Sequence, residues 1–68
     1  MELSARNQLT GRITAIRLGA VMAEVVVDIG GGLTVVAAIT RASVEALGLK
    51  EGVEVRAVIK ATDVLIAT

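Results

Sequence analysis

Three short stretches of this sequence carry groups that could together hold an anion. The members donate hydrogen bonds or positive charge, and none is an acid: Ser4, Arg6, Thr40, Ser43, Lys60 and Ala61. Arg6 stands in "SARNQ", and Lys60 ends the apolar run "VIK" before Ala61, whose backbone amide is a donor. Two cations could neutralise a dianion while hydroxyl and amide groups donate hydrogen bonds to it. The residue types therefore indicate an anion site, provided that the three stretches meet.

The stretch around Thr40 has the pattern of a helix start. Thr40 is expected as the N-cap, and Ser43 follows three residues later. The first N–H groups of a helix lack partners and form the positive end of its dipole, which favours an anion. Each piece also has a purely structural interpretation, because Thr and Ser cap helices and single cations such as Arg6 and Lys60 are commonly solvated.

Catalysis is not expected. With no His and no Cys, the chain has no ordinary nucleophile–base pair and no soft metal ligand. The acids are scattered singly: Glu2, Glu24, Asp28, Glu45, Glu51, Glu54 and Asp63. The glycine run at 30–32 lacks the Lys-Ser/Thr ending of a phosphate loop and predicts a hairpin turn. We expect no enzyme, no cofactor and no directly coordinated metal.

The composition favours a small domain that associates with itself. The 68 residues form one expected domain, 1–68, and a chain of this length buries only about 60% of its unfolded surface. No disulfide or structural zinc can staple it, and 54% of its residues are apolar. We therefore expect a homo-oligomer with an extensive apolar interface.

The charge balance argues against two classes of partner. The formal net charge is zero and no aromatic residue is present, so neither a basic footprint nor a stacking platform for nucleic acid is expected. No apolar run approaches the ~20 residues of a membrane span, and no signal-peptide pattern opens the sequence. We expect no membrane partner and a cytoplasmic location.

The hydrophobic periodicity predicts an all-β fold. Strands are expected at 9–19, 20–32, 33–39, 53–60 and 62–68, with a short helix at 40–48 that Gly48 ends. In the second strand Ala23, Val25 and Val27 face one way, while Glu24 and Val26 face the other. The element order is that of a small five-stranded OB-like barrel with one short helix between strands 3 and 4.

The chain resembles the molbindins, small molybdate- and tungstate-binding proteins whose fold recurs as a domain in regulators and transporter ATPases. The resemblance runs through "SARNQLTGRI", "GAVMAEVVVDIGGG", "ITRASVEALGLKEG" and "VIKAT" and covers nearly all 68 residues. It implies a TOBE-like, OB-like barrel, a hexamer built as a trimer of dimers, and molybdate or tungstate bound between subunits. It also implies a role in intracellular molybdenum storage or homeostasis.

The resemblance gives the six anion-site residues the role of oxyanion ligands, and all six match the family in type. It implies that "SARN" of one chain faces "T-x-x-S" and "KA" of another. Met22 departs from a polar Asn that many relatives carry, which weighs against extra oxyanion sites near a three-fold axis. Asn7 either contributes to such a secondary site or fastens the N-terminal turn. The alternative functions are a structural oligomerisation module and a nucleic-acid-binding OB-like module, neither of which binds an oxyanion.

Overall fold

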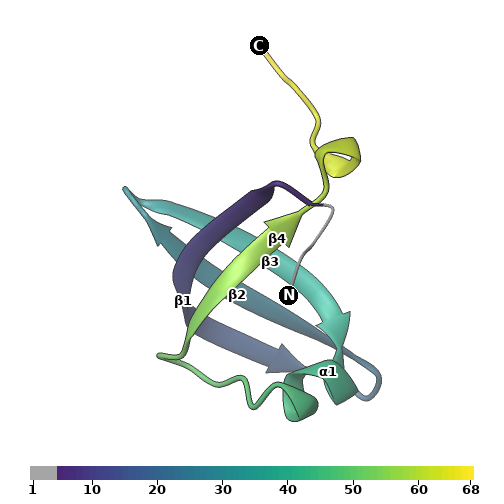
Figure 1. Ribbon diagram of the computed structural model, residues 1–68. Coiled ribbons are helices and arrows are strands. Elements are labelled where there is room, and N and C mark those ends of the chain that lie inside the picture. The colour runs from purple at the N-terminus through teal and green to yellow at the C-terminus, as the bar shows by residue number, and fades with distance from the viewer. Residues whose placement is uncertain (1–4) are drawn as a thin grey trace.

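The protein is a curled four-stranded sheet with a short helix at one end, as the computed structural model shows (Figure 1). The structure describes residues 5–68, so the predicted site residue Ser4 lies outside the described part. The elements are β1 (Asn7–Leu18), β2 (Met22–Gly30), β3 (Leu33–Thr40), α1 (Arg41–Ala46), β4 (Glu54–Ile59) and a 3-10 helix, η1 (Ala61–Asp63). The strands pair antiparallel in the order β3-β2-β1-β4, which confirms an all-β, OB-like domain with one short α-helix.

Strand β1 holds the sheet together because it pairs with two different strands along its length. Its residues 7–12 pair with β4, and its residues 12–18 pair with β2. Gly11 lies where the partner changes, and a Cβ added there would collide with the carbonyl oxygen of Asp28 and lie 2.8 Å from Cγ1 of Val27. The missing side chain therefore permits the close approach at which the sheet curls.

The predicted alternation of β2 is confirmed by its burial. Ala23, Val25 and Val27 are buried and pack with Ile13 of β1 and Val44 of α1. The register pairs these inward residues with inward residues of β3, such as Val25 with Ala37. The core is small, because inward-facing residues of β3 and β4 are only half-buried.

The turns follow the glycine chemistry that the sequence predicts. Residues 30–32 all have positive φ, at 91°, 63° and 78°, and connect β2 to β3 as a hairpin. Helix α1 ends at Ala46, and Gly48, two residues later, has a φ of +64°. The N–H of Gly48 donates to the Glu45 carbonyl (3.2 Å) and that of Leu49 to the Val44 carbonyl (3.0 Å), which is a Schellman motif. No helix within residues 5–68 is long and apolar enough to cross a membrane.

The predicted fifth strand at 62–68 is wrong for the isolated chain. Part of it lies in η1, and residues 64–68 have no regular structure and run away from the sheet (Figure 1). Leu65 and Ile66 are 92% and 86% exposed. A strand requires a neighbour for its backbone N–H and C=O groups, and none of the strands within residues 5–68 pairs with the segment.

Candidate functional site

The two cations of the proposed anion site lie next to each other at one end of the sheet. Asn7, the first residue of β1, pairs with Ile59, the last residue of β4. Arg6 directly precedes Asn7 and Lys60 directly follows Ile59, so both lie just outside the paired strands at this end, and both are exposed. Among the described residues, neither side chain makes an ion pair, since the pair found there joins Arg41 and Glu45. The strand register thus brings the two chain positions, 54 apart in the sequence, to the same end of the sheet, with no ion pair to either one within residues 5–68.

Ala61 follows directly as the first residue of η1. Lys60 is the N-cap, with extended backbone at φ −64° and ψ 141°. The N–H of Asp63 donates to the Lys60 carbonyl (2.9 Å), whereas the N–H of Ala61, at the start of the turn, has no partner inside η1. An amide donor therefore lies immediately beside the two cations.

The second group of donors lies at the start of α1. Thr40 is the N-cap, as predicted, and its Oγ1 accepts a hydrogen bond from the backbone N–H of Ser43 (3.0 Å). The two side-chain oxygens, Thr40 Oγ1 and Ser43 Oγ, are 2.7 Å apart, so one hydroxyl donates to the other. The capping bond explains why these residues start a helix, and it leaves one hydroxyl hydrogen free to donate elsewhere.

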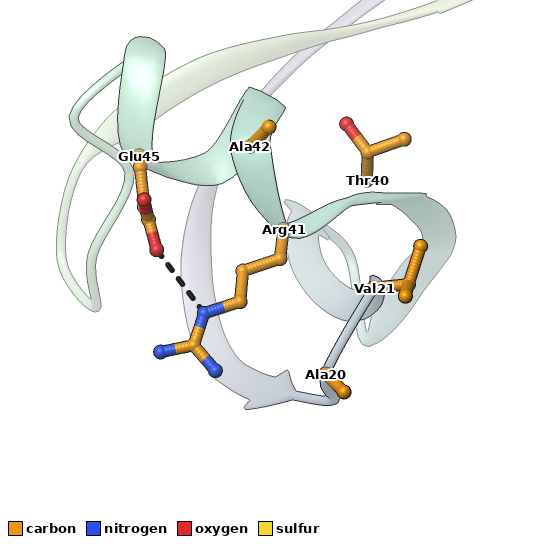
Figure 2. A pocket seen from close by; sticks show the side chains of 6 residues that line it. All are labelled: Ala20, Val21, Thr40, Arg41, Ala42 and Glu45. Atoms are coloured by element: carbon orange, nitrogen blue, oxygen red, sulfur yellow. Dashed lines mark hydrogen bonds and ion pairs between the residues drawn. The ribbon is translucent and has the colours of Figure 1, made fainter.

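A hollow of about 440 Å³ lies beside this helix start, and Figure 2 shows the side chains that line it. Arg41, which the sequence analysis did not single out, contributes its guanidinium there. Its Nε lies 3.1 Å from Oε1 of Glu45, and its Nη1 donates to the Gly19 carbonyl (3.4 Å). In the same view Thr40 points away from the Arg41 side chain. Since Glu45 neutralises Arg41, the hydroxyl pair is better suited to an anion than this hollow.

The two groups of donors lie at opposite ends of β1. Arg6 and Lys60 flank its first residue, whereas Thr40 pairs with Met22 at the start of β2, beside the last residues of β1. The strand between them has 12 residues, each advancing about 3.3 Å. Lys60 was expected to act with Thr40 and Ser43 of its own chain. Within one chain it lies at the opposite end of β1 from them, and which chains supply each half of the site stays a prediction.

Asn7 lies at the start of β1, near Arg6 and Lys60, and Met22 lies at the start of β2, near Thr40. Asn7 opens β1 and is exposed. Among the described residues, the Nε2 of Gln8 donates to the Ala5 carbonyl (3.3 Å) just before β1, and the two alternatives for Asn7 stay predictions. Met22 is half-exposed and lies on the same sheet face as its partner Thr40. Its thioether is a weak acceptor and offers no hydrogen to an oxyanion.

Comparisons with known proteins give one consistent result. The model of the TOBE domain matches residues 3–66. Molybdenum-pterin-binding protein 3 of Clostridium pasteurianum is 54% identical over 97% of this chain and 97% of its own length. A molybdate-binding protein of Sporomusa ovata, solved at high resolution, is 41% identical and has a TM-score of 0.95 over 100% of both chains. The cytoplasmic molybdate-binding protein ModG, solved with molybdate bound, is 46% identical with a TM-score of 0.92 over 96% of this chain and 46% of its own.

Proposed function

This chain belongs to the TOBE domain family, and we propose that it binds molybdate as an intact oxyanion between two copies of itself. The observation that supports the proposal is the pairing of Asn7 with Ile59, because Arg6 directly precedes the one and Lys60 directly follows the other, and neither makes an ion pair among the described residues. The relatives support the ligand, because they are molybdate- or molybdenum-pterin-binding proteins.

Molybdate suits the chemistry of the six proposed ligands. It is a tetrahedral dianion that accepts hydrogen bonds and donates none at neutral pH. In the proposal Arg6, Lys60 and the Ala61 amide come from one chain, with Ser4 of the same "SAR" stretch. Thr40 and Ser43 come from another chain. Protonated phosphate would direct its own hydrogen at one of these donors, which disfavours it. Tungstate has the same charge and shape, so we propose that it binds as well, whereas sulfate is smaller.

Association of several copies is supported by the surface area of the chain. The accessible surface is 5320 Å² for a mass of 7.0 kDa. A folded monomer of this mass is expected to expose about 4,000 Å². The excess is larger than the ~800 Å² that each partner buries in a standard interface. We propose a homo-oligomer, in the hexameric arrangement of a trimer of dimers, in which a fifth strand completes each barrel.

The proposed role is storage and homeostasis of molybdenum in the cytoplasm, the compartment named for the related ModG. Relatives named for a molybdenum pterin raise a second candidate ligand, a pterin-bound molybdenum. A pterin ring is flat and aromatic, and this chain has no Phe, Tyr or Trp on which to stack it. The free oxyanion is therefore the better match.

Calorimetry with molybdate, tungstate and sulfate on the same oligomer tests the proposal. We expect Lys60→Ala or Arg6→Ala to weaken molybdate binding by about 2–5 kcal/mol, since each removes one member of a desolvated charge pair. Lys50→Ala is the matched control, because Lys50 is also an exposed lysine but lies in the loop after α1. Unchanged affinity and stoichiometry in both site variants would contradict the assignment.

The two rival functions predict different outcomes in simple assays. A structural oligomerisation module would give the same assembly by native mass spectrometry but no heat with any oxyanion. A nucleic-acid-binding module would give a salt-dependent gel shift. The outer face of the sheet argues against nucleic-acid binding. In the strand register Arg12 lies opposite Asp28 and Arg17 lies opposite Glu24, so positive and negative side chains are mixed and form no basic stripe.

A further inference from the structure

Two exposed side chains on neighbouring strands are linked by hydrogen bonds to the backbone just before β1. Arg56 of β4 donates from Nη1 to Oε1 of Gln8 in β1 (2.9 Å). Gln8 in turn donates from Nε2 to the carbonyl oxygen of Ala5 (3.3 Å). We infer that Gln8 and Arg56 are positioning residues, which fix the backbone from which Arg6 reaches a bound oxyanion. This inference rests on the proposed function.

The strand register makes this pair of hydrogen bonds, the relay, possible. Arg56 lies opposite Thr10 in the pairing of β1 with β4, and Gln8 lies opposite Val58. Arg56 and Gln8 are therefore diagonal neighbours on one face of the sheet, because side chains two residues apart on a strand share a face. Diagonal neighbours of this kind are within reach of long side chains. The relay thus depends on the same register that brings positions 6 and 60 to one end of the sheet.

Arg56 also decides which way round the Gln8 amide lies. A guanidinium group has donors and no acceptor, so the amide oxygen must face Arg56. The amide nitrogen then faces the Ala5 carbonyl, which has lone pairs and no hydrogen to donate. A flipped amide would set donor against donor at Arg56 and acceptor against acceptor at Ala5. The two hydrogen bonds of the relay therefore support each other and allow a single orientation.

The relay acts on Arg6 because the Ala5 carbonyl and the Arg6 N–H belong to one peptide group. A peptide group is planar and trans, so a hydrogen bond that fixes its C=O also fixes its N–H and the next Cα atom. Ala5 is itself buried, at 7% exposed. On the other side of Arg6, Asn7 is paired with Ile59. The backbone of Arg6 is thus held from both sides while its side chain stays exposed.

The relay contributes more to orientation than to the cohesion of the sheet. β1 and β4 are already joined by backbone pairing of residues 7–12 with residues 54–59. Ala5 lies outside this paired region, so the relay constrains a part of the chain that strand pairing leaves free. A group that is held in its binding position beforehand loses less freedom when the ligand binds. Loss of the relay is therefore expected to lower affinity for the oxyanion more than stability.

Calorimetry with molybdate on the full-length protein tests the relay. Gln8→Met removes both hydrogen bonds at unchanged net charge and similar side-chain length. We expect it to raise the Kd for molybdate about three- to tenfold, while the urea midpoint measured without molybdate hardly moves. Arg56→Met should raise the Kd at least as much, and Arg56→Lys, which keeps the charge and a donor, should stay within about twofold of the natural protein. Gln8→Met added to Arg56→Met should cost nothing more, because the two residues act as a unit.

Arg12→Met is the matched control for the loss of one positive charge. Arg12 is also an exposed arginine with a single neutral partner, since its Nη1 donates to the Gly52 carbonyl (3.1 Å). It lies six positions after Arg6, about 20 Å along the strand. Its loss should change the Kd less than about twofold. Equal rises in Kd for Arg12→Met and Arg56→Met, or an unchanged Kd in Gln8→Met, would overturn the inference.

Backbone amide relaxation, measured by NMR without molybdate, separates this inference from the proposed function. An order parameter of about 0.85 marks rigid backbone, and one below about 0.6 marks flexible backbone. We expect the Arg6 N–H to be rigid in the natural protein and to approach the flexible value in Gln8→Met. An unchanged order parameter contradicts the relay whatever calorimetry shows. If the natural protein binds no molybdate, the proposed function fails, and the order parameters still decide whether Gln8 and Arg56 hold Arg6.

Discussion

The hairpin of β2 and β3 and the segment 64–68 have similar compositions but different structures. Both are rich in valine, isoleucine, leucine and alanine, and neither contains proline. In the hairpin, Val25 and Val27 are buried against neighbours on β1 and β3, whereas Leu65 and Ile66 are exposed. The difference shows that β-propensity selects residues able to form a strand, while a paired neighbour decides whether the strand exists.

The largest effect is expected from the same substitution made in the two regions. Ile13→Ala removes a side chain that is 2% exposed at the centre of the core, so we expect the free energy of unfolding to fall by about 2–5 kcal/mol. Ile66→Ala should change the stability of the dilute, dissociated chain by less than about 0.5 kcal/mol. Urea titration at low protein concentration measures both.

The concentration dependence of these two variants sharpens the comparison. If segment 64–68 is covered by another copy in the oligomer, Ile66→Ala lowers stability at high concentration, where copies associate, and Ile13→Ala lowers it at every concentration. An Ile66→Ala effect as large as that of Ile13→Ala in the dissociated chain would show that the segment packs within its own chain.

A smaller effect is expected at Gly11, where β1 changes its partner from β4 to β2. Gly11→Ala puts a Cβ against the Asp28 carbonyl oxygen, which belongs to backbone and cannot rotate away. We expect the free energy of unfolding to fall by about 1–3 kcal/mol, as in other overpacked sites. Thr10→Ala, at the exposed neighbouring position, is the control for a change of strand propensity. Equal stability of the two variants in thermal melts would contradict the tight approach of β1 to β2.

The helix cap is expected to contribute about 1 kcal/mol. Thr40→Ala removes the oxygen that accepts the Ser43 N–H at 3.0 Å, and losses of about 0.5–2 kcal/mol are usual for such caps. Thr34→Ala, an exposed threonine near the other end of β3, is the matched control. If Thr40 is also an oxyanion ligand, Thr40→Ala lowers the molybdate affinity of the folded protein as well as its stability, whereas Thr34→Ala leaves the affinity unchanged. Identical affinity for the two variants would limit Thr40 to capping.

The smallest expected effect is that of pH. No histidine is present, so no side chain with an ordinary titration between pH 6 and 8 contributes to the proposed site. Molybdate affinity measured by calorimetry should stay constant across this range at constant ionic strength. A steep change would show that a group outside the six proposed ligands controls binding.

Much of the fold could be predicted because its signals are local. The alternation in β2, the glycine run at 30–32, the Thr40 cap and the Gly48 stop all appear in the structure where the sequence places them. The double pairing of β1 and the role of Gly11 could not be predicted in this way. They depend on contacts between Gly11 and Asp28, which are brought together by curvature of the sheet.

The candidate site, like the fold, could be predicted from the sequence only where its signals are local. Its residue types are evident from the sequence, since cations and hydroxyls occur in short runs without acids beside them. The grouping of Lys60 with Arg6 follows from strand register, which joins positions 7 and 59 and carries no local signal. Arg41 lies beside Thr40, but its pairing with Glu45 became evident only in the folded helix.

The sequence by itself determined the all-β class, the turns, the single short helix and a set of donors free of His, Cys and aromatic residues. These properties depend on side-chain chemistry and on spacings of a few residues. Only the tertiary structure decided that Arg6 and Lys60 adjoin a paired end of β1 and β4, and that Thr40 and Ser43 lie at the far end of β1. It also decided that segment 64–68 has no strand partner among the described residues. Hydrogen-bonded register between distant strands sets these relations, because backbone pairing joins any two extended segments that fit and is not encoded by either segment alone.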